Sequence, residues 1–177
     1  YYSHYNGSSW HQNTESAFKR YVDVPHEPRY CFGYGLSYTE YSYACMEIDR
    51  KEIKENQPVH ISAVIKNTGN RDGVEIVQLY VQDRCASVLR PNMELAGFVR
   101  VPLKTGESRK VIFDLWPDQL GYIGSDKKWI LEAGEVEILL GASSEDIRLK
   151  DSIKVIQDIP VDERNRKFYA SAKINTL

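Results

Sequence analysis

Apolar and polar residues alternate along most of the chain after residue 38, and this two-residue period is typical of half-buried β-strands. The clearest stretch is 59–66, where every second residue is apolar and the residues between include His60 and Ser62. The same alternation predicts further strands at 38–48, 75–83, 94–101, 111–115, 135–140 and 147–156. Asp151 interrupts the inward-facing series of the last of these strands, so we expect a β-bulge there.

Turn-forming residues separate these strands at intervals of about 8 to 12 residues. The densest turn is 67–73, which reads Asn-Thr-Gly-Asn-Arg-Asp-Gly. Residues 121–124 and 129–131 predict a small hairpin around a polar turn, and no stretch has the period of an amphipathic helix. The pattern predicts an all-β fold, an immunoglobulin or fibronectin III-like antiparallel β-sandwich of about seven strands.

The first part of the chain has a different character, because residues 1–29 show no period of either kind. Yet 12 of the 20 aromatic residues lie within the first 43 positions, which is too many for a solvated linker. We therefore divide the chain into an extended arm and interdomain linker (1–37), the β-sandwich (38–156) and a charged C-terminal tail (157–177). The tail is expected to form one helical turn or no regular structure.

The aromatic side chains of the arm are expected to contact another surface or a ligand. They either pack on the sandwich or a neighbouring domain, or they form a platform on which sugars stack; packing is the more common use. The predicted strand 75–83 has an unusually apolar outer face, so partial cover by the arm, the tail or another domain is expected there. The residues that we select as candidate interdomain contacts are Tyr30, Phe32, Tyr34, Tyr38, Ile76 and Tyr80.

Length and charge narrow the possibilities. The chain has 177 residues and a formal net charge of −2, which suits one hydrophobic core and gives no broad field for nucleic acid or an anionic membrane surface. Its three cysteines, Cys31, Cys45 and Cys85, have neither metal-site nor disulfide spacing and indicate a reducing compartment, so a cytoplasmic location is favoured over a secreted one. No apolar run is long enough for a transmembrane helix, and no signal peptide is recognisable at the N-terminus.

No group of residues in the sequence predicts an active site. Glu135 and Glu137 have the spacing of a glycosidase carboxylate pair, but they alternate with buried residues and are expected to face water, where nothing separates their pKa values. Residues 143–146 are polar and lie between two strands, which is first of all a turn, and Gly33-Tyr34-Gly35 lacks the strand and helix of a dinucleotide site. We expect no cofactor and no metal; the histidines, which lack ligand spacing, are His4, His11, His26 and His60.

One segment carries a family resemblance. Residues 30–39 read Tyr-Cys-Phe-Gly-Tyr-Gly-Leu-Ser-Tyr-Thr and resemble the signature Pro-Phe-Gly-Tyr-Gly-Leu-Ser-Tyr-Thr at the entry to the fibronectin type III-like domain of family 3 glycoside hydrolases, with Cys31 in place of the proline. The likeness continues in order and spacing through 67–69, 73–81, 90–98, 106–108, Trp129 and 141–148. The opening residues 1–6 also resemble that family's Tyr-Tyr-Asn-His segment, although the Gly-Arg-Pro that follows it there is absent.

The resemblance implies a non-catalytic domain at the C-terminus of a β-glucosidase-like or β-xylosidase-like enzyme, which hydrolyses terminal β-glycosidic bonds. In that family the nucleophilic Asp lies on a barrel domain and the acid/base residue usually lies on an α/β sandwich domain, so no catalytic residue carries over to this sequence. The implied partners are these two catalytic domains of the same parent chain. The alternatives are a carbohydrate-binding module that uses the arm aromatics and, less favoured, a free-standing adhesion module.

Overall fold

The structure, a computed structural model, describes residues 28–83, 86–88 and 90–177. Its regular elements are strands together with one 3-10 helix, η1 (Pro117–Leu120). The strands are β1 (Tyr41–Ile48), β2 (Glu52–Ile53), β3 (Val59–Asn67), β4 (Gly73–Asp83), β5 (Glu94–Leu103), β6 (Ser108–Leu115), β7 (Tyr122–Ile123), β8 (Trp129–Leu131), β9 (Gly134–Gly141), β10 (Ile147–Val155), β11 (Ile159–Pro160) and β12 (Ser171–Thr176).

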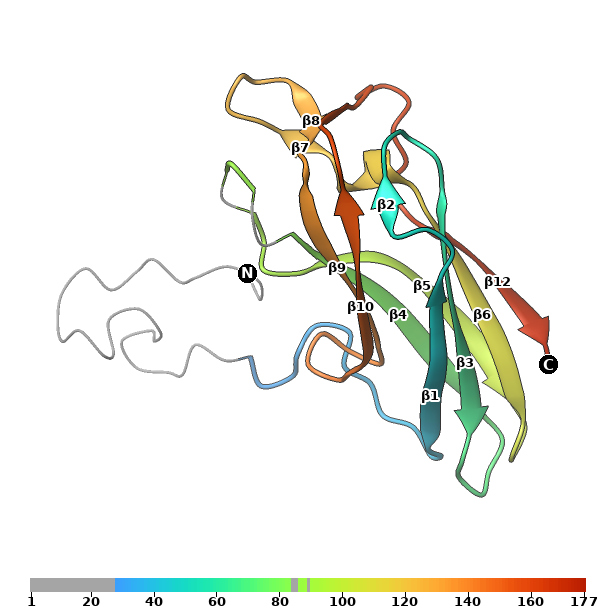
Figure 1. Cartoon of the computed structure of the whole chain (residues 1–177). Helices are drawn as coiled ribbons and strands as arrows, with labels where there is room; N and C mark the ends of the chain where they lie inside the picture. The colour runs from blue at the N-terminus through green and yellow to red at the C-terminus, as the bar shows by residue number, and fades with distance from the viewer. Residues whose placement is uncertain (1–27, 84–85, 89) are drawn as a thin grey trace, which may run out of the picture.

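Two sheets form a β-sandwich, which confirms the predicted fold class (Figure 1). One sheet has four strands in the order β1-β3-β6-β12, and the other has five in the order β2-β10-β9-β4-β5. Neighbouring strands are antiparallel except for the short β2, which pairs with β10 in parallel. A third sheet of three short strands, β11-β8-β7, lies at the end of the sandwich near η1.

The alternation seen in the sequence explains how the core forms. On β3 the apolar residues at every second position are buried, and on β4 Val77, Leu79 and Val81 face the same interior. Side chains from both sheets, such as Phe113 and Ile138, belong to one buried apolar cluster. The apolar side chains of the two sheets thus pack against one another between the sheets. Most of the polar residues that alternate with them lie on the outer faces of the sandwich.

The described residues form twelve strands, more than the seven or so expected. The predicted hairpin 121–131 is present as β7 and β8, whereas β2 and β11 have two residues each and are too short to show a period. The first strand begins at Tyr41 and not near residue 38, because Thr39 is held in a bend: its N–H donates to Ser37 Oγ (3.2 Å) and its hydroxyl to Asn67 Oδ1 (2.8 Å).

The segment 157–177 does not form the helical turn or irregular tail that we expected. Residues 162–165 make a turn, and β12 then pairs with β6 along its whole length, from Ser171 opposite Asp114 to Thr176 opposite Arg109. The sandwich therefore extends beyond residue 156.

The bulge expected at Asp151 is also misplaced. Asp151 stays in register opposite Ile138, and its carboxylate forms an ion pair with the Lys51 ammonium. The register of β10 shifts instead between Ile147 and Leu149.

Candidate docking surface

The segment that enters the sandwich, residues 30–38 (hereafter the collar), is held against the five-stranded sheet by hydrogen bonds that its backbone carbonyls accept. Gly33 has a φ of +79°, and the Tyr34 N–H donates to the Cys31 carbonyl (3.1 Å), which makes a tight turn. The Phe32 carbonyl accepts a hydrogen bond from the Ser144 N–H (2.9 Å), in the turn between β9 and β10. The collar (blue in Figure 1) therefore lies beside that turn.

Two polar side chains of β4 are buried beneath the collar. Gln78 is 4% exposed, and its Nε2 donates to the Gly33 carbonyl (3.0 Å) and the Ala142 carbonyl (2.5 Å). Tyr80 is 2% exposed, and its hydroxyl donates to Gln78 Oε1 (2.5 Å). Burial raises the pKa of Tyr80 to about 12, which keeps the phenol protonated and able to donate. The outer face of β4 is thus partly covered by the chain's own collar, as the apolar face of this strand suggested.

The six candidate interdomain contacts fall into two groups. Tyr80 lies under the collar, whereas the side chains of the other five remain open to solvent: Tyr30 (60% exposed), Phe32 (44%), Tyr34 (50%), Tyr38 (92%) and Ile76 (36%). The rings of Tyr30 and Tyr34 contact one another, with their centroids 5.3 Å apart. Whether these side chains touch another domain stays a prediction.

Three further apolar side chains extend this surface. Leu36 in the collar is exposed, and so are Val74 on β4 and Phe98 on β5. Phe98 lies opposite Gln78 in the antiparallel register, so it faces outward beside the collar. Alternation along 94–101 could have shown that Phe98 faces away from the core, but only the register reveals that it adjoins β4.

The collar and the residue that follows it, Thr39, approach β4 at two points. The collar meets the strand at Gln78, and the methyl group of Thr39 lies so close to Gly73 that a Cβ there would be 2.7 Å away. Tyr34, Leu36 and Tyr38 belong to the segment between these two points. We call the exposed apolar side chains of this region the docking surface: Tyr30, Phe32, Tyr34, Leu36, Tyr38, Val74, Ile76 and Phe98.

The carboxylates and the histidine singled out in the sequence are engaged in local contacts. Glu135 accepts a hydrogen bond from Ser152 Oγ (2.6 Å) and Glu137 pairs with the Lys150 ammonium (3.0 Å), so both have partners on β10. His60 bonds to Asp114 through Nδ1 (2.7 Å) on the outer face of the other sheet. Within the residues that the structure describes, no three or more His, Cys, Asp and Glu side chains form a group that could hold a metal ion.

Two carboxyl side chains, those of Glu75 and Asp118, are buried instead. Glu75 is 7% exposed at the end of β4, and it accepts a hydrogen bond from the Tyr43 hydroxyl (2.8 Å). Burial raises the pKa of Glu75, partly opposed by Tyr43 and by the nearby Arg148 guanidinium. Asp146 forms an ion pair with Arg148 (2.8 Å), which holds the pKa of Asp146 below its usual range.

Two of the three cysteines, Cys31 and Cys45, are free thiols, and Cys31 donates weakly to Ser143 Oγ (3.3 Å). The arm residues 1–27, with their own aromatic residues and His4, His11 and His26, and the third cysteine, Cys85, lie outside the described residues. In the part of the chain that the structure describes, no helix is long and apolar enough to cross a membrane.

Comparison with known proteins identifies the domain. Residues 75–144 match the fibronectin type III-like domain family. A thermostable β-glucosidase B of Acetivibrio thermocellus is 42% identical over 147 residues, which cover 82% of this chain and 20% of that protein. A putative β-xylosidase of Formosa agariphila is 39% identical over 130 residues, which cover 73% of this chain and 17% of that protein.

Solved structures agree with this comparison. The crystal structure of a β-glucosidase from Listeria innocua in complex with glucose superposes with a TM-score of 0.76 at 32% identity, over 88% of this chain and 22% of that one. The chain spans about a fifth of the length of the curated relatives that it matches. Fold, motifs and relatives agree, and the chain belongs to the fibronectin type III-like domains of family 3 glycoside hydrolases.

Proposed function

We propose that the chain is the non-catalytic accessory domain of an enzyme that hydrolyses terminal β-glycosidic bonds, and that its docking surface packs on the catalytic domains of the same protein. The observation that carries the first part is the length of the match: the relatives are β-glucosidases and β-xylosidases, and the similar part is about a fifth of each. The remaining four-fifths have room for the domains that would carry the catalytic carboxylates.

The docking surface supports the second part. Exposed aromatic rings on a fixed backbone are typical of the central part of an interface, because they bury a large apolar area and lose little conformational entropy. Tyr38 and Leu36 are 92% and 89% exposed, although the chain on either side of them is held by hydrogen bonds: the Gly33 carbonyl accepts from Gln78, and the Thr39 hydroxyl donates to Asn67. The partners proposed are the barrel domain and the α/β sandwich domain that such an enzyme contains.

The size and activity of the native protein test the proposal. An antibody raised against this chain should detect, in the source cells, a band several times larger than 20.4 kDa. The immunoprecipitate should hydrolyse a nitrophenyl β-D-glucoside or β-D-xyloside. A band near 20.4 kDa without either activity would contradict the proposal. The same cells, separated into fractions, would test the expected cytoplasmic location, which stays a prediction.

Sugar binding by the arm aromatics is the competing function. On our proposal, soluble β-linked oligosaccharides leave the tryptophan fluorescence of the 177-residue chain unchanged. Saturable quenching, lost on replacement of Trp10, would favour the carbohydrate-binding alternative.

A further inference from the structure

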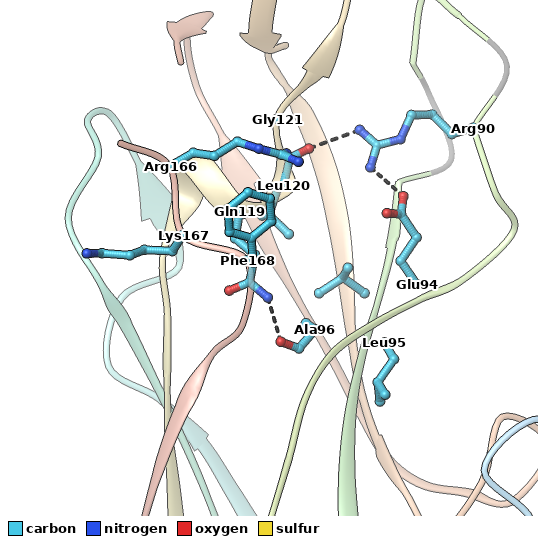
Figure 2. Close-up of a pocket in the computed structure, with 11 residues that line it drawn as sticks. Arg90, Glu94, Leu95, Ala96, Gln119, Leu120, Gly121, Arg166, Lys167 and Phe168 are labelled. Atoms are coloured by element: carbon cyan, nitrogen blue, oxygen red, sulfur yellow. Dashed lines mark hydrogen bonds and ion pairs between the residues drawn. The ribbon is translucent and has the colours of Figure 1, made fainter. Parts of the chain in front are cut away.

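The arginine side chains of the domain differ in how their charge is balanced. Arg90 lines a cavity of about 160 Å³ that lies where β5, η1 and the connection from β11 to β12 meet (Figure 2). Its guanidinium donates to Glu94 Oε1 (2.5 Å) and to the Leu120 carbonyl (2.9 Å). The charge of Arg90 is therefore balanced within the domain. Polar side chains line much of this cavity: Arg90, Glu94, Gln119, Arg166 and Lys167.

Two further arginines are also held by the domain itself. Arg148 forms an ion pair with Asp146 (2.8 Å). The Arg166 guanidinium lies between two rings, 4.0 Å from the Trp129 centroid and 4.7 Å from the Phe168 centroid. An arginine that has a carboxylate or a ring face within its own domain does not require a partner from outside it.

Arg100 lacks contacts of this kind, although it lies among apolar side chains on the outer face of β5. In the part of the chain that the structure describes, no carboxylate forms an ion pair with it and no ring stacks on it. The antiparallel register places Arg100 directly opposite Ile76 of β4, and Pro102 opposite Val74. Phe98, the preceding outward-facing residue of β5, is exposed, as is Arg100. The guanidinium therefore belongs to the same face as the docking surface.

Covering the docking surface changes the surroundings of Arg100. In the chain alone the guanidinium is exposed and solvated by water. A second domain that buries Ile76 and Phe98 removes part of this water, and arginine cannot respond by losing its charge. The neighbouring side chains of Ile76, Phe98 and Pro102 are apolar and offer no acceptor. A carboxylate on the covering domain would restore the lost hydrogen bonds, because its two oxygens match the planar fork of the guanidinium.

We propose that the part of the longer enzyme that packs on the docking surface presents a carboxylate, from Asp or Glu, to Arg100. The apolar side chains supply the buried area, and the ion pair fixes the orientation of the two domains, since a displaced fit leaves Arg100 covered without a partner. This proposal rests on the proposed function, because it requires another domain to cover the docking surface. The competing source of a carboxylate is the chain's own arm, whose acidic residues are Glu15, Asp23 and Glu27.

Cross-linking detects the proposed carboxylate directly. Arg100→Lys places an amine at this position, and a carbodiimide joins an amine to a carboxylate only where the two are in contact. In the longer enzyme, mass spectrometry should find position 100 joined to an Asp or Glu of another domain. The 177-residue chain with the same substitution should give no cross-link at this position, and neither should the wild-type enzyme, because a guanidinium does not react.

Stability measurements test the energetic consequence. Arg100→Met removes the charge and leaves the partner carboxylate covered without a cation, so it should lower the Tm of the longer enzyme by several degrees. In the chain alone, where Arg100 is exposed, the Tm should change by less than about 2 °C. Arg164→Met is the matched control, because Arg164 is exposed in the turn 162–165, outside the docking surface, and its loss should affect both proteins equally.

The double substitution Tyr34→Ala with Tyr38→Ala separates a failure of this ion pair from a failure of docking. If it weakens the longer enzyme selectively, but Arg100→Met does not and no cross-link forms, another domain covers the surface without a carboxylate at Arg100 and the ion-pair proposal is wrong. If the double substitution weakens both proteins equally, docking and the ion pair both fail. A cross-link from position 100 to an acidic residue of the arm in the chain alone would also overturn the proposal.

Discussion

At the scale of single residues, Gly33 determines how the collar meets the sheet. Its φ of +79° lies in the left-handed region, and a Cβ there would be 2.0 Å from Gln78 Oε1 and 2.8 Å from the Tyr80 hydroxyl. Two separate requirements, backbone angle and close approach, therefore favour glycine at this position. The buried Gln78–Tyr80 pair depends on that approach for the hydrogen bond to the Gly33 carbonyl.

We expect Gly33→Ala to lower the free energy of unfolding by about 2–3 kcal/mol, from left-handed strain plus the disturbed Gln78 contacts. Gly35→Ala is the matched control, because a methyl group added at Gly35 would have no atom within 4 Å and the residue has no positive φ. The control should change stability by less than about 0.5 kcal/mol. Urea unfolding of the three proteins measures this, and equal losses in both variants would show that the turn at Gly33 is not specifically required.

Glu75 gives the domain a pH dependence whose sign follows from its burial. The pKa of Glu75 is raised in the folded state, against about 4.3 in an unfolded chain. The folded protein therefore holds this proton to higher pH, and the stability that it gains is complete below the unfolded pKa and is lost as pH rises through the raised folded pKa. Arg148 opposes this shift and Asp146 adds to it.

Glu75→Gln removes the titration and keeps an oxygen that can accept the Tyr43 hydrogen bond. Relative to wild type, this variant should become progressively more stable as pH rises above the unfolded pKa of about 4.3 and through the raised folded pKa, because the wild-type carboxyl ionises there. Denaturant unfolding at four pH values gives the difference curve. Glu145→Gln, at an exposed site in the turn between β9 and β10, is the control and should stay within about 0.5 kcal/mol of wild type. A flat curve for Glu75→Gln would refute the assignment.

At the scale of secondary-structure elements, sequence periodicity was sufficient where a strand buries one face fully, as in β3. It failed for β12, whose residues are at best half-buried at the edge of the four-stranded sheet. The charged turn before β12 gave no sign that the chain would return to pair with β6. That pairing follows from tertiary contacts, such as the hydrogen bond from the Ala170 N–H to the Ala96 carbonyl (2.8 Å).

Asn67 is a polar residue whose burial could not be predicted from the local sequence either. The turn at 67–73 was predicted from its composition, but Asn67 is itself 0% exposed and its amide bonds to Thr39, Arg71 and Leu103. Nothing local in the sequence distinguishes this Asn from Asn70, which is exposed. Its partners come from three separate segments, so its role appears only when the fold is known.

Deleting residues 171–177 should therefore destabilise the sandwich, although the segment looked like a tail. The deletion exposes the edge of β6 and removes Ala172 and Ile174, which pack against the core. A loss of about 2–4 kcal/mol is expected from the apolar area and the unpaired strand edge. Removal of Leu177 alone, 67% exposed and outside β12, is the control and should have little effect. Thermal unfolding of both truncations makes the comparison, and a change below about 0.5 kcal/mol for the long deletion would contradict it.

At the scale of the whole molecule, the docking surface and the cavity near η1 differ in chemistry and in position. The docking surface is apolar and lies along the collar and the outer faces of β4 and β5, whereas the cavity is polar and lies near η1. The family motif at 30–39 indicated the domain and the aromatic residues, because both are local in sequence. Two details were not predictable: that Tyr80 lies under the collar while Ile76 stays open to solvent, and that Phe98 adjoins β4. Each depends on how the collar and β5 lie across β4.

If the docking surface contacts another domain, the same substitutions should lower the stability of the longer enzyme more than that of this chain alone. Tyr34 and Tyr38 are 50% and 92% exposed in the chain alone, so replacing both with Ala should lower its stability by no more than about 1 kcal/mol. In the longer enzyme the same rings would be buried, and each would contribute about 1.5–3 kcal/mol, so the double variant should lose several degrees more in Tm. Tyr169→Ala, 72% exposed and outside the docking surface, should affect the two proteins equally. A ring that contacts a second domain cannot be removed without weakening that contact. Equal losses of stability for the double variant in the chain alone and in the longer enzyme would therefore show that the collar contacts only its own sandwich.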